Sequence, residues 1–141
     1  MKATGIVRRI DDLGRVVIPK EIRRTMRIRE GDPLEIYTTR EGEVIFKKYS
    51  LIGGLEDFAA QFCDTLSRST DFTAAVTDRD AVIAVAGPGK RELLGKSVSD
   101  QLEKIMAERS LYQFTGLGAM PRICGDNETF TAAVAAPVLC E

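Results

Sequence analysis

The chain of 141 residues contains no histidine and only three cysteines. The absence of histidine excludes Ser-His-Asp and Cys-His catalysis, histidine general bases and most zinc sites. Cys63, Cys124 and Cys140 are an odd, widely spaced set, which favours a reducing, cytoplasmic setting over a disulfide framework. The sequence therefore predicts no enzyme, no metal site and no bound cofactor.

Long apolar runs and an N-terminal signal peptide are also lacking. No stretch approaches the roughly 18 to 20 apolar residues that cross a bilayer, and Lys2 is followed at once by a mixed polar and apolar pattern. Hydrophobic residues make up 44% and charged residues 29% of the chain, which is typical of folded globular proteins. We expect a soluble protein with two small domains and no membrane partner.

Positive charge is concentrated near the N-terminus, although the net charge is −1. Residues 1–50 hold 12 Lys and Arg against 8 Asp and Glu, a net charge of +4, whereas residues 51–141 hold 8 against 13, a net charge of −5. Within residues 1–29 the balance is 9 against 3, or +6. This split predicts that the first part meets a polyanion. On charge alone, a solvated basic face explains it equally well.

The first 50 residues predict the element order β-β-α-β-β. Strands are expected over 5–10, 15–18, 34–39 and 43–48, with turns at 11–14 and 40–42 and a helix over 20–27 after Pro19. A unit this small buries little apolar surface alone. Strand pairing between two copies would pool the apolar side chains of both into one core. These side chains are Ile6, Val16, Ile18, Ile22, Leu34, Ile36, Val44 and Phe46.

The remaining residues predict a mixed α+β domain. A connecting helix is expected within 51–70, and its apolar stripe is a predicted interface between copies. The stripe consists of Leu55, Phe58, Phe62 and Leu66. Further strands are expected over 72–77, 81–86 and 129–139, a surface loop over 89–97 and a helix over 99–109 capped by Ser97 or Ser99. A second apolar set forms either a core or a small-molecule pocket: Phe72, Ala74, Val76, Val82, Ala84, Phe130 and Val134.

Three motifs in the first 50 residues carry a family resemblance. The run Thr4–Pro19 (TGIVRRIDDLGRVVIP), the triplet Ile22–Arg24 and the run Gly31–Tyr37 (GDPLEIY) resemble the AbrB-type swapped-hairpin DNA-binding domain. The resemblance implies a β-barrel formed by a dimer, with double-stranded DNA as partner. Residues 1–50 are thus predicted to be this domain.

Two later motifs extend the resemblance. The run Thr77–Val85 (TDRDAVIAV) and the run Gly95–Ser99 (GKSVS) resemble the stage V sporulation protein T family, in which a helix and a GAF-like domain follow the AbrB-type domain. The similarity fades from about Tyr112, and the family continues beyond the position of Glu141 through another strand and a closing helix. We therefore expect a connecting helix over 51–70 and a partial GAF-like domain over 71–141.

The family's functional arginines map onto Arg8, Arg15, Arg23 and Arg24, with Arg9 as a plausible neighbour. Guanidinium groups stay charged and form forked hydrogen bonds to phosphate or to the O6 and N7 edge of guanine. On a strand over 5–10, Arg8 and Arg9 would point to opposite faces. The structural alternative for these arginines is a salt bridge to Asp11, Asp12 or Glu21. The resemblance also implies limited base readout, with recognition helped by DNA shape.

The sequence thus predicts a DNA-binding transcription regulator of sporulation or stationary-phase genes. It would act in the cytoplasm at the nucleoid, as a homodimer or homotetramer, with a C-terminal domain that tunes oligomerisation or senses a small molecule. Neither that molecule nor its binding residues can be named from the sequence. Two alternatives stay open: an antitoxin of a toxin–antitoxin pair, and an effector-binding module that acts through a protein partner.

Overall fold

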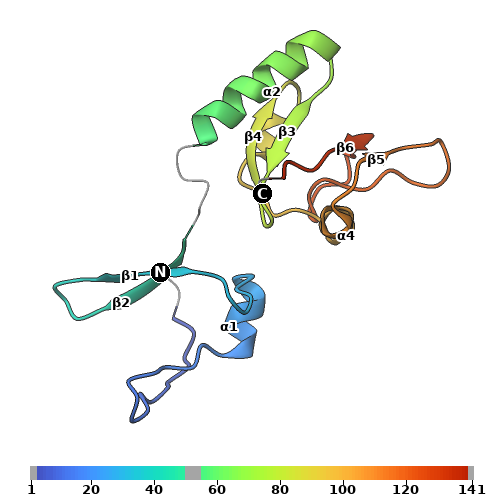
Figure 1. The fold of residues 1–141 in the computed structure, drawn as a ribbon. Coiled ribbons are helices and arrows are strands. Elements are labelled where there is room, and N and C mark those ends of the chain that lie inside the picture. The colour runs from blue at the N-terminus through green and yellow to red at the C-terminus, as the bar shows by residue number, and fades with distance from the viewer. Residues whose placement is uncertain (1–2, 50–54, 140–141) are drawn as a thin grey trace. The chain divides into compact units, whose positions relative to one another are not determined.

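A computed structural model describes residues 3–49 and 55–139, and the chain divides into two compact units, 1–51 and 52–141 (Figure 1). Helices and strands occur in both units, which confirms the predicted α+β class. No helix among the described residues has the length and apolar character needed to span a membrane. Residues 51–54, which the sequence placed in the connecting helix, and Cys140 lie outside the described residues.

The first unit contains helix α1 (Lys20–Thr25) and an antiparallel hairpin of β1 (Leu34–Thr38) and β2 (Val44–Lys48). Alternating apolar residues favour these strands, and Ile36 lies opposite Phe46 in the register. The tight turn between them uses Gly42 at a φ of 86°, a conformation that glycine adopts at low cost. The hairpin agrees with the prediction to within a residue at each strand end.

The predicted strands over 5–10 and 15–18 are not strands in this chain. The turn at 11–14 forms, but no ladder of backbone hydrogen bonds flanks it among the described residues. The predicted order β-β-α-β-β is therefore wrong for a single chain. A strand needs a pairing partner for its N–H and C=O groups, and the described part of one chain offers these segments none.

The first unit has almost no core of its own. Pro19 is the one buried residue among 3–49. Most of the apolar residues predicted to pool between two copies are exposed in the single chain: Ile6, Val16, Ile36, Val44 and Phe46. A unit with this surface needs further apolar contacts to be stable.

The second unit is built on a hairpin of β3 (Ala74–Thr77) and β4 (Val82–Ala86), against which helix α2 (Glu56–Thr70) packs (Figure 1). Between them lies a cluster formed by Ala59, Cys63, Ala84 and Ala86. A second cluster contains Val82 and Val85 of β4 with Leu93 and Cys124. Burial raises the pKa of the Cys63 and Cys124 thiols, so both favour the neutral form.

The other elements of the second unit are short. They are α3 (Lys90–Leu93), α4 (Asp100–Glu108), β5 (Tyr112–Gln113) and β6 (Val134–Ala135). Helix α4 is capped by Ser99, whose Oγ accepts the N–H of Leu102 at 3.0 Å, so Ser99 rather than Ser97 is the cap. The predicted strand over 129–139 is wrong for most of its length, because β6 and a single bridge at Thr131 are its only paired residues among those described.

The second apolar set divides in the structure. Val82 and Ala84 are buried, and Ala74, Val76 and Phe130 pack against the two clusters. Phe72 and Val134 are 76% and 61% exposed, so their assignment to a core or pocket is wrong for the single chain.

Candidate nucleic-acid interface

The turn at residues 11–14 is organised by Asp11. Its Oδ1 accepts hydrogen bonds from the backbone N–H groups of Leu13 at 3.0 Å and Arg15 at 2.8 Å. The backbone N–H of Asp11 donates to the carbonyl of Arg15, and the Asp11 carbonyl accepts the N–H of Gly14, each at 3.0 Å. This is the side-chain-to-backbone pattern by which Asp favours turns. One residue thus fixes the geometry that precedes Arg15.

Asp11 also holds the side chain of Arg15. The Nε of Arg15 donates to Oδ2 of Asp11 at 2.8 Å, although the arginine side chain is 70% exposed. The backbone N–H and then the guanidinium of Arg15 lower the pKa of Asp11, so the carboxylate is charged near neutral pH. The predicted structural alternative, a salt bridge to Asp11, is therefore present for Arg15. Among the described residues, no hydrogen bond engages the two Nη groups of this arginine.

Helix α1 presents the next basic residues. Pro19 precedes its first turn, and Arg23 and Arg24 lie in its last turn, where positive charge suits the helix dipole. The Nε of Arg23 donates to the carbonyl of Ile18 at 3.1 Å, which ties the helix to the segment before it. The helix ends two residues earlier than predicted because Arg27 adopts a left-handed φ of 52°.

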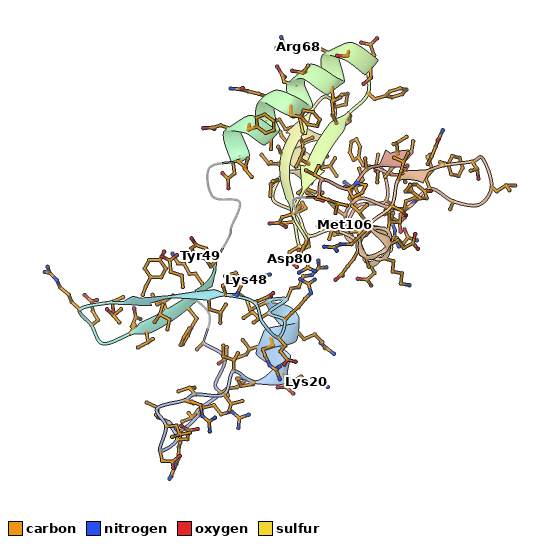
Figure 2. The ribbon with its side chains drawn as sticks, viewed as in Figure 1. Lys20, Lys48, Tyr49, Arg68, Asp80 and Met106 are labelled. Atoms are coloured by element: carbon orange, nitrogen blue, oxygen red, sulfur yellow. The ribbon has the colours of Figure 1, made fainter. Side chains whose placement is uncertain are left out.

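The far end of α1 is attached to the hairpin. The Nζ of Lys48, the last residue of β2, donates to the carbonyl of Arg27 at 3.0 Å. Figure 2 labels Lys48 beside its neighbour Tyr49. Lys48 therefore has a structural role within this unit.

The remaining arginines of the predicted site are unattached. Arg8, Arg9 and Arg24 are exposed, and their side chains have no hydrogen bond or ion pair among the described residues. Because residues 5–10 do not form a strand in the single chain, the prediction that Arg8 and Arg9 face opposite sides remains untested. The structure links the turn, the segment 15–18 and α1, whereas Arg8 and Arg9 lie in the extended chain before the turn.

An exposed apolar stripe runs along helix α2 of the second unit. It contains the four predicted residues Leu55, Phe58, Phe62 and Leu66, which are 39% to 64% exposed. The rings of Phe58 and Phe62 stack with centroids 6.3 Å apart and planes at 13°. The helix packs on its own sheet through Ala59 and Cys63 instead. The stripe is therefore not used by the described residues of its own unit.

The described residues of the second unit form a shallow polar hollow of about 360 Å³. It is lined by Arg91, Glu92, Lys96, Asp126 and Asn127, and the Lys96–Asp126 pair lies 3.4 Å apart. The mixed charges of this hollow largely balance one another. It offers no evident preference for an anionic or an apolar ligand.

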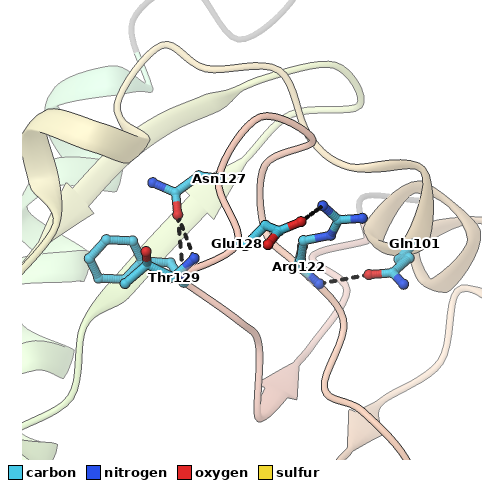
Figure 3. Close-up of polar contacts among 6 residues, drawn as sticks. Gln101, Arg122, Asn127, Glu128 and Thr129 are labelled. Atoms are coloured by element: carbon cyan, nitrogen blue, oxygen red, sulfur yellow. Dashed lines mark hydrogen bonds and ion pairs between the residues drawn. The ribbon is translucent and has the colours of Figure 1, made fainter.

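The loop beside this hollow is held by local polar contacts (Figure 3). The Oε1 of Gln101 accepts the backbone N–H of Arg122 at 2.9 Å, and the Nη1 of Arg122 lies 3.2 Å from Glu128. The Oδ1 of Asn127 accepts the backbone N–H groups of Thr129 and Phe130. These contacts shape the loop, and each has a structural purpose.

Sequence reasoning predicted five DNA-binding arginines, which stay a prediction, and it missed how two of them are held. Asp11 was considered as a turn residue and as one of three salt-bridge partners, but its hold on the Nε of Arg15 was not predicted, and the Ile18 carbonyl was not considered. The signal for Asp11 was available, because an Asp three residues before Gly14 is typical of a turn closed by its own side chain.

Comparison with protein families matches both parts of the chain. Residues 54–141 match the family model described as stage V sporulation protein T C-terminal, transcription factor. Residues 7–51 match the model described as antidote-toxin recognition MazE, bacterial antitoxin.

Individual proteins give the same division. Stage V sporulation protein T of Bacillus subtilis (strain 168) is 52% identical over 139 residues, which are 99% of this chain and 78% of that protein. The transition state regulatory protein AbrB of the same organism is 63% identical over 49 residues, 35% of this chain and 50% of that protein. The solution structure of the N-domain of AbrB is 62% identical, with a TM-score of 0.33, over 36% of this chain and 94% of that structure.

The C-terminal family model covers more than half of the chain, and the relative that is 52% identical is covered over 78% of its length. These matches confirm the resemblance drawn from the sequence motifs. The chain belongs to the stage V sporulation protein T family of transcription factors.

Proposed function

We propose that this protein is a DNA-binding transcription regulator of sporulation or of the transition state. It binds double-stranded DNA through Arg8, Arg9, Arg15, Arg23 and Arg24 of its first unit. The observation that carries this proposal is the set of five exposed arginines around one turn and one helix, in a segment with a net charge of +6 over residues 1–29. Family membership supports the same function. A regulator of this kind acts in the cytoplasm, at the nucleoid.

Two copies of the chain act together in this proposal. Among residues 3–49 the first unit buries only Pro19, and its predicted strands over 5–10 and 15–18 are unpaired. An AbrB-type swapped-hairpin dimer would pair these segments and cover Ile6 and Val16. Symmetry would then double the arginine surface.

The second unit tunes oligomerisation through helix α2. Its exposed stripe is apolar and has helical spacing. None of its four residues belongs to either of the two buried clusters of this unit. Packing of two such helices would join dimers into a tetramer. The relation of this unit to a GAF-like domain, and the sensing of a small molecule, stay predictions of the sequence resemblance.

The antitoxin alternative is not favoured. The antitoxin model matches only residues 7–51, and the residues after them form a compact unit that matches a transcription factor family instead. A regulator that works only through a protein partner remains the outcome to be distinguished from direct DNA binding.

The test is DNA binding as a function of salt. The full-length wild type is compared with an Arg15→Ala/Arg24→Ala double variant, with circular dichroism as the check on folding. We expect wild-type affinity to fall roughly 10³-fold between 50 and 200 mM salt if six or more phosphates are contacted. The variant should bind more weakly and with a shallower salt dependence.

The matched control is an Arg79→Ala/Arg91→Ala double variant, which removes two exposed arginines from the second unit. It should bind DNA like the wild type. Weak binding that is indifferent to Arg15 and Arg24 would overturn the proposed function and favour action through a protein partner.

A further inference from the structure

Two of the five arginines are attached to the protein through Nε alone. Arg15 donates to the Asp11 carboxylate, and Arg23 donates to the Ile18 carbonyl. Because neither contact uses the Nη groups, both arginines keep the outer edge of the guanidinium available. The other three arginines have no such attachment among the described residues.

An Nε attachment changes what an arginine can do at a DNA surface. It holds the guanidinium plane in one orientation before DNA arrives, so less side-chain freedom is lost on binding. The two Nη groups then present a fixed fork, the geometry that matches the O6 and N7 edge of guanine. An unattached arginine still provides charge, which phosphates attract from many directions.

The presence of Asp11 supports the same view. A carboxylate close to DNA repels phosphates, so its charge alone would weaken binding. Asp11 nevertheless lies between the arginines, and both its oxygens are used on Arg15 or the turn that carries it. Its contacts among the described residues give it one way to favour binding, which is to hold Arg15 and the turn before it.

We propose that Asp11 and the Ile18 carbonyl are positioning groups, which orient Arg15 and Arg23 to make forked contacts with base edges. These two arginines supply the sequence preference, whereas Arg8, Arg9 and Arg24 supply charge-driven affinity for any duplex. The inference rests on the proposed function, because it assigns different roles within the same DNA-binding surface.

The first experiment separates charge from geometry with lysine substitutions in the full-length protein. Wild type is used to select a duplex from a randomised pool, and the affinity ratio between that duplex and a scrambled one is measured at constant salt. Arg15→Lys and Arg23→Lys should each lower this ratio about 5- to 100-fold, the range expected for the loss of one forked base contact. Affinity for the scrambled duplex should change little.

Arg24→Lys is the matched control, because Arg24 neighbours Arg23 on the same helix and lacks the attachment. It should leave the ratio within about twofold of wild type. The inference is overturned if Arg23→Lys and Arg24→Lys lower the affinity ratio equally. It is also overturned if neither Arg15→Lys nor Arg23→Lys lowers that ratio.

The second experiment is a double-mutant cycle between Asp11 and Arg15. Asp11→Asn keeps an oxygen that can accept the N–H groups of Leu13 and Arg15, but it removes the charge that attracts the guanidinium. With Arg15 present, the substitution should weaken binding to the selected duplex. In an Arg15→Ala background it should leave binding unchanged or strengthen it, because only phosphate repulsion is removed.

The cycle overturns the role of Asp11 if Asp11→Asn strengthens binding to the same extent in both backgrounds. If Asp11→Asn does not fold, the lysine comparison decides. A wild type that binds no duplex refutes the proposed function itself. A wild type that binds every duplex equally, so that selection enriches none, leaves DNA binding intact and refutes only this inference.

Discussion

Gly89 lies against the tip of the Phe130 ring in the second unit. Its φ is +83°, and a Cβ atom built on it would fall 2.2 Å from Cζ of that ring. Such contacts do not occur in real structures, so any side chain here must displace the ring. Phe130 packs on the cluster that contains Leu93 and Cys124, and the displacement would reach that cluster.

We therefore expect Gly89→Ala to lower the free energy of unfolding by about 2 to 4 kcal/mol, from left-handed strain and overpacking together. Gly95→Ala is the control, since Gly95 has a similar φ of +75° but nothing within 4 Å of a built Cβ. Gly95→Ala should lower the free energy of unfolding only by the left-handed strain, about 1 kcal/mol. Urea unfolding followed by circular dichroism measures both, and equal losses would contradict a role for the ring.

At the residue scale, the five arginines proposed to bind DNA follow from charge and motif, but their attachments do not. Arg15 and Arg24 read alike in the sequence as exposed basic residues. Only the closed turn brings the carboxylate of Asp11 to the Nε of Arg15. Backbone geometry over several residues decides whether an arginine donates through Nε or through Nη. The residue type alone does not encode this choice.

Helix α4 depends on one buried serine. Ser99 is 3% exposed, accepts the N–H of Leu102 and donates a short hydrogen bond to the carbonyl of Arg122. It therefore both caps the helix and holds the chain around Arg122.

Ser99→Ala should destabilise the protein by about 2 kcal/mol, because it removes a helix cap and leaves a partly buried carbonyl without its donor. Ser97→Ala changes an exposed serine two residues away and should stay within about 0.5 kcal/mol of wild type. Denaturant midpoints of the two variants give the comparison. A similar loss for both would mean that the cap contributes little.

The stripe on α2 gives a prediction about assembly. Phe62→Glu places a charge on the exposed stripe, whereas Gln61→Glu adds the same charge to the neighbouring exposed position. Burying the new carboxylate between helices would be strongly unfavourable. Light scattering after size exclusion should find a smaller species for Phe62→Glu and the wild-type mass for Gln61→Glu. An unchanged mass for Phe62→Glu would exclude the stripe as an interface.

At the element scale, elements with a strong periodic pattern could be predicted from the sequence, and very short elements could not. The pattern over 55–66 predicted α2, and Ser99 was one of two predicted caps of α4. The helix α3 and the strand β5 have four and two residues, too few for a periodic signal. The segments 5–10 and 15–18 have strand-forming residues, but strand formation depends on a pairing partner, and residues 3–49 and 55–139 of one chain offer none.

At the scale of the whole molecule, the second unit has a buried core, whereas the described part of the first unit has almost none. Leu93, Val82 and Cys124 are fully buried in the second unit, while only Pro19 is buried among residues 3–49. The stability of the first unit should therefore depend on association with a second copy, and so on protein concentration.

Hydrogen exchange of the full-length protein tests this expectation over about a hundredfold range of concentration. Amides of β1 and β2 should exchange more slowly as concentration rises, because association stabilises the folded form. Amides of β4 serve as the reference, since that strand is buried within its own chain. Exchange in β1 and β2 that is independent of concentration would contradict the need for a second copy.

The missing core of the first unit also has a consequence for gene control. If only the paired form is folded and able to bind DNA, its amount at low expression rises with the square of the protein concentration, so a tenfold rise in synthesis gives about a hundredfold rise in active regulator. Such a response has a threshold. A cell could keep this regulator silent at basal expression and engage its promoters over a narrow range of accumulation, without any signal other than its own abundance.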